Sequence, residues 1–371
     1  LVFPKECYTG YIIGAIRALY EHDNDVSETD FSVICDVINH YISSNDDNVI
    51  MEILGLIEHF AEKNWQEEII QFVCDKAVNS SSQSIGLGKE SKACPKTLLI
   101  SAMNCVRGCA IMAMSQLIWE HNELAIRFKP IVQNAVNCTD EAIRFISFSC
   151  VLPYFNIDKD FCANELKALM QNETCILGHS GVWEVLCSDY QNDSDFYISF
   201  LIKACASGIE EVNDIAARYL CATAIYYDFN LVQQLFGLSL NEKQIQMVCE
   251  QAMCGFDNPE YYENSKAILL HYIGFGKTNM FYLSRLFREG HVEIDRDEDL
   301  ILTLLYSKSN EYLIHTVLDY IYEQDQDITQ YSSVLNSLTE ELFTNNNLSD
   351  KYTIKGDLVK CIIKLIDRNK C

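Results

Sequence analysis

The stretch NCVRGCAIMAMSQLIWEHNE, residues 104–123, decides the fold class of this chain. Counted from Val106, offsets of 3, 4, 7, 8, 11 and 12 residues all fall on apolar side chains, namely Cys109, Ala110, Ala113, Met114, Leu117 and Ile118. Residues with this spacing form a stripe along one face of an α-helix. We therefore expect a helix here, with its apolar stripe packed against a core.

The same template recurs along the chain. It fits segments that start at Val49, Ile143 and Val212, with one polar residue breaking the stripe in each. The arginine recurs in register, because Arg107 and Arg144 are 144 − 107 = 37 residues apart. Second amphipathic segments lie between these helices, and a period of about 35 residues is typical of helical repeats. We predict an all-α fold, a right-handed helix-pair solenoid with HEAT/TPR-like repeats; the alternative is an irregular all-α domain.

Breaks in the pattern divide the chain into four parts. Residues 79–97, NSSSQSIGLGKESKACPKT, are rich in Ser and Gly and predict an exposed loop of a length that is often functional. The remaining parts are N-terminal helical repeats over 1–78, central HEAT-like repeats over 98–240, and degenerate helical repeats over 241–371 that end in a helix near 354–368. The opening at Leu1, without a methionine, is expected for a segment of a longer polypeptide.

Charge and cysteine usage narrow the class of protein. The formal charge is -25, from 53 acidic and 28 basic residues, and such a surface repels nucleic acid. The 17 cysteines are odd in number and sit mostly at predicted core positions: Cys35, Cys74, Cys109, Cys150, Cys221 and Cys249. We expect free thiols in a cytoplasmic protein. No apolar run of 18 residues occurs, so no membrane span is predicted.

Several short motifs resemble catalytic or ligand-binding sequences, but each lacks a required residue. IGFGKTN at 273–279 and GLGKES at 86–91 lack the first glycine and the preceding strand of a phosphate-binding loop. GHSG at 178–181 lacks the second glycine of a nucleophile elbow. The acidic run at 295–300 has Leu300 where a calcium loop needs glycine, so we interpret it as a solvated helix start. The histidines show no metal-ligand spacing, and we expect no catalytic, cofactor-binding or metal-binding residues.

Surface recognition by proteins remains as a function. Aromatic residues and arginine carry much of the binding energy in protein interfaces. The candidates for partner contact are Arg107, Trp119, Arg127, Arg144, Tyr154 and Trp183. The structural alternative is that the arginines bond carbonyl groups or an acid in the neighbouring helix pair, and that the tryptophans pack between repeats.

Two segments carry a family resemblance. NCVRGCAIMAMSQLIWEHNEL and the following DEAIRFISFSCVLPYFNIDKDF resemble the C-terminal region of bacterial antiviral STAND NTPases of the Avs type. That family has the form NSVRGxAxxAIxxLL, followed by xAVRxxxxxxLxPLLNxDRDxA. The matches in the first segment are Asn104, Val106, Arg107, Gly108, Ala110, Ala113, Leu117 and Ile118. Those in the second are Ala142, Ile143, Arg144, Leu152, Pro153, Asn156, Asp158 and Asp160, and the resemblance covers about residues 100–228.

The resemblance implies a sensor. In such proteins the C-terminal helical region binds a phage protein, the large terminase subunit or the portal, and the contact triggers oligomerisation and activation of an effector. ATP and Mg²⁺ are expected only for an NTPase domain of a parent polypeptide, because this sequence has no phosphate-binding loop. Oligomerisation is likewise expected only for the full-length protein.

Two other functions stay open. One is a general HEAT-type scaffold or adaptor with a host partner and no sensing role. The other is an enzyme of the helical-repeat DNA glycosylase kind, which the negative charge disfavours because such enzymes need a basic groove.

Overall fold

The computed structural model describes residues 27–79, 93–273, 281–307, 311–324, 328–344 and 352–368, together with Gly14. Every element in these ranges is a helix and none is a strand, which confirms the all-α prediction. Contacts divide the chain into two units, Leu1–Val212 and Asn213–Cys371. The division falls inside α13 (Glu210–Tyr226), whereas the sequence pattern placed a boundary at 240.

The first unit contains, before α13, eleven described α-helices and two short 3-10 helices. They are α2 (Glu28–Tyr41), α3 (Asp47–His59), α4 (Glu67–Asn79), α5 (Pro95–Met103), α6 (Val106–Glu120), η2 (Asn122–Leu124), α7 (Ala125–Val136), α8 (Glu141–Val151), α9 (Tyr154–Ile157), α10 (Lys159–Asn172), η3 (Thr174–Gly178), α11 (Val182–Asp189) and α12 (Ser194–Ala204).

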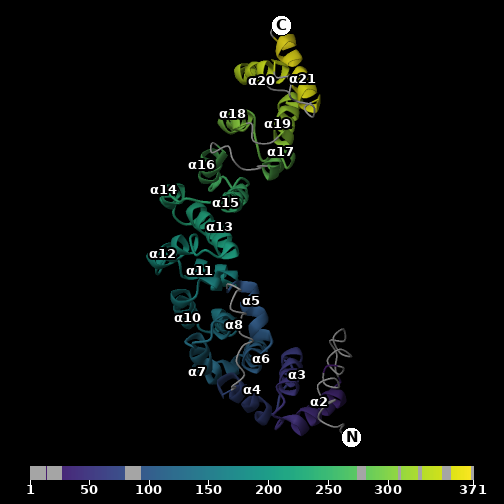
Figure 1. Cartoon of the computed structure of the whole chain (residues 1–371), viewed down its shortest axis with the longest axis vertical. Helices are drawn as coiled ribbons and strands as arrows, with labels where there is room; N and C mark the ends of the chain where they lie inside the picture. Colours follow the sequence, from purple (N-terminus) through teal and green to yellow (C-terminus); the bar gives the residue numbers. More distant parts are fainter. Residues whose placement is uncertain are drawn as a thin grey trace. The chain divides into compact units, whose positions relative to one another are not determined.

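Helices of the first unit pack in two rows. In one row α6 lies between α3 and α8, and in the other α7 lies between α4 and α10 (Figure 1). The rows are joined where α4 packs against α6 and α7 against α8. Helix starts are marked by acidic caps, since the Asp140 carboxylate accepts the backbone N–H groups of Ala142 and Ile143 at the start of α8.

Helix α6, which carries the apolar stripe predicted from the sequence, is buried on more than the face that bears this stripe. Its stripe residues are buried, except that Cys109 is only half-buried, contrary to the predicted core position. Ile111 and Ser115, which lie outside the stripe, are buried as well, because α3, α4, α5 and α8 all pack against α6. Trp119 is among the few exposed residues of this helix. This helix is therefore the centre of the first unit and not its edge.

The predicted loop over 79–97 is shorter than the sequence indicated. Helix α4 ends at Asn79 and α5 begins at Pro95, so both ends of the predicted loop are helical; residues 80–92, which include GLGKES, lie outside the described ranges. Proline suits the first position of a helix, where no backbone N–H partner is needed. Within the described ranges no single helix has the length and apolar character to cross a membrane; α5 and α6 reach it only as a pair bent by 95°.

The second unit continues from α13 with eight more described α-helices. They are α14 (Leu231–Phe236), α15 (Glu242–Met253), α16 (Tyr262–Ile273), η4 (Phe281–Leu283), α17 (Ser284–Arg288), α18 (Glu298–Ser307), α19 (Glu311–Glu323), η5 (Thr329–Tyr331), α20 (Ser332–Thr344) and α21 (Tyr352–Arg368). The last of these confirms the helix predicted near 354–368.

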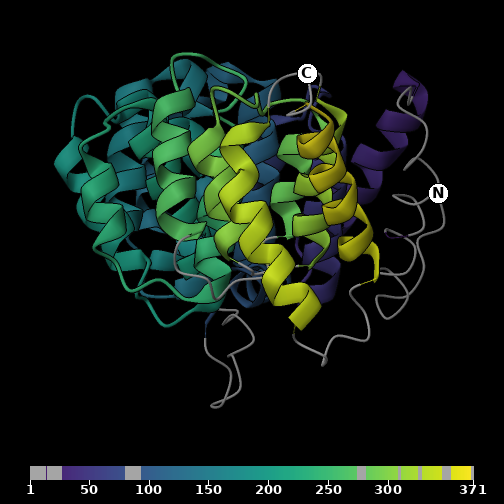
Figure 2. The ribbon, with the colours of Figure 1, turned by 90° about the horizontal axis from the view of Figure 1, so that it is seen from above.

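Rows of helices also occur in the second unit, where the sequence repeats were no longer recognisable. Helix α18 packs against both α16 and α20, and α19 packs against both α17 and α21. Helices α20 and α21 lie side by side, drawn in yellow-green and yellow in Figure 2. The glycine motif at 273–279 falls almost wholly on residues 274–280, outside the described ranges.

The described cysteines are free thiols, as predicted, and they differ in access to solvent. Cys254 is exposed, whereas Cys150 is buried completely and burial raises the pKa of its thiol. Since the thiolate is the reactive form, we expect Cys254 to react fast with Ellman's reagent and Cys150 to react only on unfolding.

This prediction is checked by counting fast-reacting thiols in the native protein. Cys254→Ser is expected to remove one of them and Cys150→Ser none. A fast thiol lost in the Cys150 variant would contradict the burial described above.

Candidate functional site

Arg107 joins three helices instead of facing a partner. From the second residue of α6 its Nε donates to the carbonyl of Ala77 in α4 at 2.8 Å. Its terminal nitrogens donate to the Asn134 Oδ1 at 2.9 Å and to the Cys138 Sγ at 3.1 Å, at the end of α7. The guanidinium donors are therefore used within the first unit, in agreement with the structural alternative.

Arg144, which has the same register in the sequence template, is the fourth residue of α8. One terminal nitrogen donates to the carbonyls of Cys138 and Thr139 at 2.8 and 2.9 Å, and the other lies 3.8 Å from the Glu173 carboxylate. Arg127 on α7 likewise bonds Glu67 and Gln71 of α4, each at 2.7 Å. All three predicted arginines thus hold neighbouring helices together.

The aromatic candidates separate into buried and exposed groups. Tyr154 is wrongly predicted as a contact residue, because its ring is buried and its hydroxyl donates to the Ala125 carbonyl at 2.6 Å. Trp183 is half-buried at the start of α11. Trp119 is 41% exposed, so of the six candidates it is the one whose side chain is most open to a partner.

Residues that carry the family resemblance serve the fold. Gly108 sits at the corner between α5 and α6, where a Cβ atom would lie 2.0 Å from the Ala102 carbonyl oxygen. Asp158 caps α10 by accepting the Phe161 N–H, and its carboxylate bonds the Lys129 ammonium at 2.7 Å. That bond from Lys129 and the Phe161 N–H lower the pKa of Asp158. These residues of the motif therefore act in packing, whereas others that match it, Asn104, Asn156 and Asp160, are exposed.

Ser149 and His179 form a pair that the sequence did not indicate. The Ser149 hydroxyl lies 2.9 Å from Nε2 of His179, and the Nδ1 atom of that ring lies 2.8 Å from the Ser180 carbonyl. The ring also packs against Phe145 and Phe148. Burial lowers the pKa of His179, and this effect outweighs the bond to the Ser180 carbonyl, which acts to raise the pKa. The lowered pKa favours the neutral ring. Because a backbone carbonyl stands where a catalytic triad has a carboxylate, we interpret the pair as a link from α8 to the loop before α11.

Asp297 corrects the prediction of a solvated acidic helix start. Its carboxylate is buried completely where α16 packs against α18. It accepts hydrogen bonds from the Tyr262 hydroxyl and, at 2.8 Å, from the Glu293 backbone N–H. The Arg296 guanidinium lies 2.9 Å and the Lys266 ammonium 3.5 Å from its oxygens. A buried carboxylate needs such partners, and the protein supplies all of them here.

The largest of the described cavities has mixed charge. It lies in the second unit, has a volume of about 510 Å³, and includes Arg285, His291, Asp257 and Glu289 in its lining. These charges pair with one another, since Arg285 bonds Glu289 at 3.2 Å and His291 lies 2.5 Å from Asp257. The lining therefore selects no single ligand chemistry.

Two described helices present apolar side chains to solvent on one face. The α5 face comprises Leu99, Ile100 and Met103, which are 37%, 49% and 47% exposed. The α21 face comprises Val359, Ile363 and Ile366, which are 42%, 52% and 48% exposed. Contiguous exposed apolar groups mark binding surfaces in soluble proteins.

No protein-family model matches this chain, and no curated protein matches it.

Proposed function

We propose that this chain is a protein-recognition module, the ligand-sensing region of an antiphage STAND NTPase of the Avs type. In this proposal the chain is a right-handed helix-pair solenoid with HEAT/TPR-like repeats, and the rows of packed helices support it. The observation that carries the proposal is the α5 face, three apolar side chains on adjacent turns of one helix. Helix α5 packs against α6, which carries Arg107 and Gly108, at the start of the part of the chain that resembles the sensor family.

Partner chemistry follows from charge and exposure. The α5 face supplies an apolar anchor, and hot spots of protein interfaces are well-packed apolar contacts of this kind. The net charge of -25 favours a partner with a basic surface, as expected of a phage packaging protein such as the large terminase subunit or the portal. ATP, Mg²⁺ and oligomerisation belong to the parent polypeptide, which acts in the cytoplasm.

A binding assay with matched variants tests this proposal. The purified chain is titrated with phage large terminase subunits and portal proteins, and we expect one of them to bind. Replacing Leu99, Ile100 and Met103 with serine is expected to weaken binding at least about 30-fold, the effect of one interface hot spot. Raising the salt from about 50 to about 500 mM is expected to slow association, because the charges are screened.

The α21 face supplies the control. Replacing Val359, Ile363 and Ile366 with serine exposes the same number of hydroxyl groups in the other unit, and binding is expected to stay unchanged. Loss of binding in this variant, with the α5 variant unaffected, would contradict the assignment of the α5 face. Absence of binding to either phage protein would exclude the sensor, and a host partner bound through α5 would establish the adaptor function instead.

A further inference from the structure

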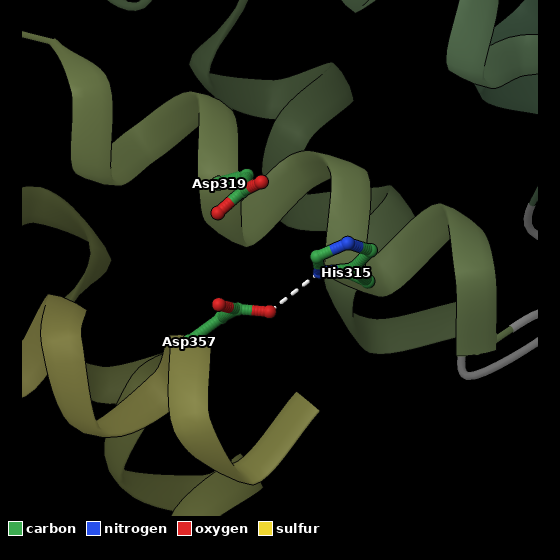
Figure 3. A group of neighbouring side chains, drawn as sticks. All are labelled: His315, Asp319 and Asp357. Atoms are coloured by element: carbon green, nitrogen blue, oxygen red, sulfur yellow. Dashed lines mark hydrogen bonds and ion pairs between the residues drawn. The ribbon is translucent and has the colours of Figure 1, made fainter. Parts of the chain in front are cut away.

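Three side chains from two helices of the second unit form a group with the donors of a metal site. His315 and Asp319 are four residues apart on α19, so they lie on successive turns of one face. Asp357 lies on α21, which packs against α19. One donor atom from each residue lies within 4.8 Å of the others, and Figure 3 shows the three side chains together.

The contacts within this group do not use the Asp319 carboxylate. Nδ1 of His315 lies 2.5 Å from Oδ2 of Asp357, and the Lys360 ammonium bonds the other oxygen, Oδ1, at 2.8 Å. Asp357 is almost completely buried, whereas Asp319 is half-buried. Within the described part of the chain, the Asp319 carboxylate makes no hydrogen bond or ion pair. The hydrogen bond between α19 and α21 needs only His315 and Asp357, and Asp319 adds a negative charge near Lys360 without bonding it.

A cavity open to solvent reaches two members of the group, His315 and Asp319. It has a volume of about 300 Å³. Besides His315 and Asp319, its lining includes Arg288, Tyr320 and Glu323. The Arg288 guanidinium is bonded to the Ser284 hydroxyl at 2.8 Å. The cavity therefore supplies an approach path, and room for the waters that complete the shell of an ion held by three protein ligands.

We propose that His315, Asp319 and Asp357 bind one divalent transition-metal ion, with Mn²⁺ as the ion that best fits the donors. Two carboxylates and one imidazole combine oxygen ligands, which suit Mn²⁺, with a nitrogen ligand that first-row ions accept. With a neutral imidazole, the two carboxylates and Lys360 sum to one negative charge, which attracts a dication.

Electron paramagnetic resonance of Mn²⁺ added to the full chain tests the proposal. At about 0.15 M ionic strength, where a diffuse acidic surface is screened, we expect one saturable site per chain. Asp319→Asn and His315→Gln are each expected to weaken binding at least about tenfold, because removal of even an outer-shell partner of a metal ligand costs about that much. A nitrogen coupling in the bound signal is expected for the wild type and not for His315→Gln. Mn²⁺ is chosen because the free thiols of this chain bind it poorly.

Asp295→Asn is the matched control, because Asp295 is an exposed carboxylate in the acidic run of the same unit. Its variant is expected to bind Mn²⁺ as the wild type does. The proposal is overturned by absence of saturable binding, by unchanged affinity in Asp319→Asn, or by an equal loss in Asp295→Asn. If His315→Gln does not fold, as judged by circular dichroism, the Asp319 variant and the nitrogen coupling of the wild type decide. The site is independent of the α5 face, so failure of either proposal leaves the other standing.

Discussion

Replacement of Gly108 with alanine is expected to destabilise the first unit by about 3 kcal/mol, the upper end of the usual cost of overpacking. The added Cβ would lie 2.0 Å from the backbone oxygen and 2.6 Å from the carbonyl carbon of Ala102. Both atoms are backbone, so no side chain can rotate away and the corner between α5 and α6 must open. At the same corner the Gly108 N–H donates a hydrogen bond to the Sγ atom of Cys105, the residue that caps α6.

Urea unfolding followed by circular dichroism measures this loss, with Gly356→Ala as the control. Gly356 lies inside α21, where an added Cβ meets nothing within 4 Å. Alanine there is expected to stabilise the protein by about 0.5–1 kcal/mol, because it has the higher helix propensity. Equal effects of the two substitutions would contradict the role of the corner.

Replacement of Asp189 with alanine is expected to cost about 3 kcal/mol, as for other buried polar groups that lose a charged partner. One oxygen of Asp189 accepts the Tyr197 hydroxyl and lies 2.9 Å from the Lys167 ammonium, and the other accepts the Asn192 amide at 2.8 Å. These partners tie α10, α11 and α12 together. Tyr197 is fully buried, so its hydroxyl would be left without an acceptor. Tyr197→Phe, which removes only the donor, is expected to cost about 1 kcal/mol.

The same carboxylate makes stability depend on pH. Burial alone would raise the pKa of Asp189, but the bonds from Asn192, Lys167 and Tyr197 outweigh it and lower that pKa below its ordinary value. A lowered pKa in the folded state adds stability that is complete above the unfolded pKa of about 3.9. That stability is lost as the pH falls from there through the folded pKa. The stability difference between wild type and Asp189→Asn is therefore expected to shrink below about pH 4, and a constant difference would contradict the assignment.

Helical class and the positions of the central helices could be predicted because periodicity is a local property. The stripe beginning at Val106 has the period of a helix whatever packs against it. The start of α5 was missed because the composition of residues 79–97 is that of a loop, and only Pro95 marks the change. Rows of helices in the second unit were not recognisable, because packing requires apolar faces and does not require a repeated sequence.

Candidate sites could be predicted less well, since they depend on which helices meet. Arginine type and spacing identified Arg107 and Arg144, but the carbonyl acceptor of Arg107 lies in α4 and the Glu173 partner of Arg144 lies at the end of α10. The exposure of Leu99 and Ile100 was hidden because an apolar residue in a helix is ordinarily buried. His315 and Asp357 are 42 positions apart, so no local motif joins them; only the packing of α19 on α21 does.

Cys138 is where the two repeated arginines converge, since Arg107 bonds its sulfur and Arg144 its carbonyl oxygen. Through Arg107, which also bonds the Ala77 carbonyl, the turn at Cys138 is connected to α4, and through Arg144 it is connected to α8. Successive helix pairs of the first unit are therefore joined at this residue by polar bonds as well as by their apolar faces.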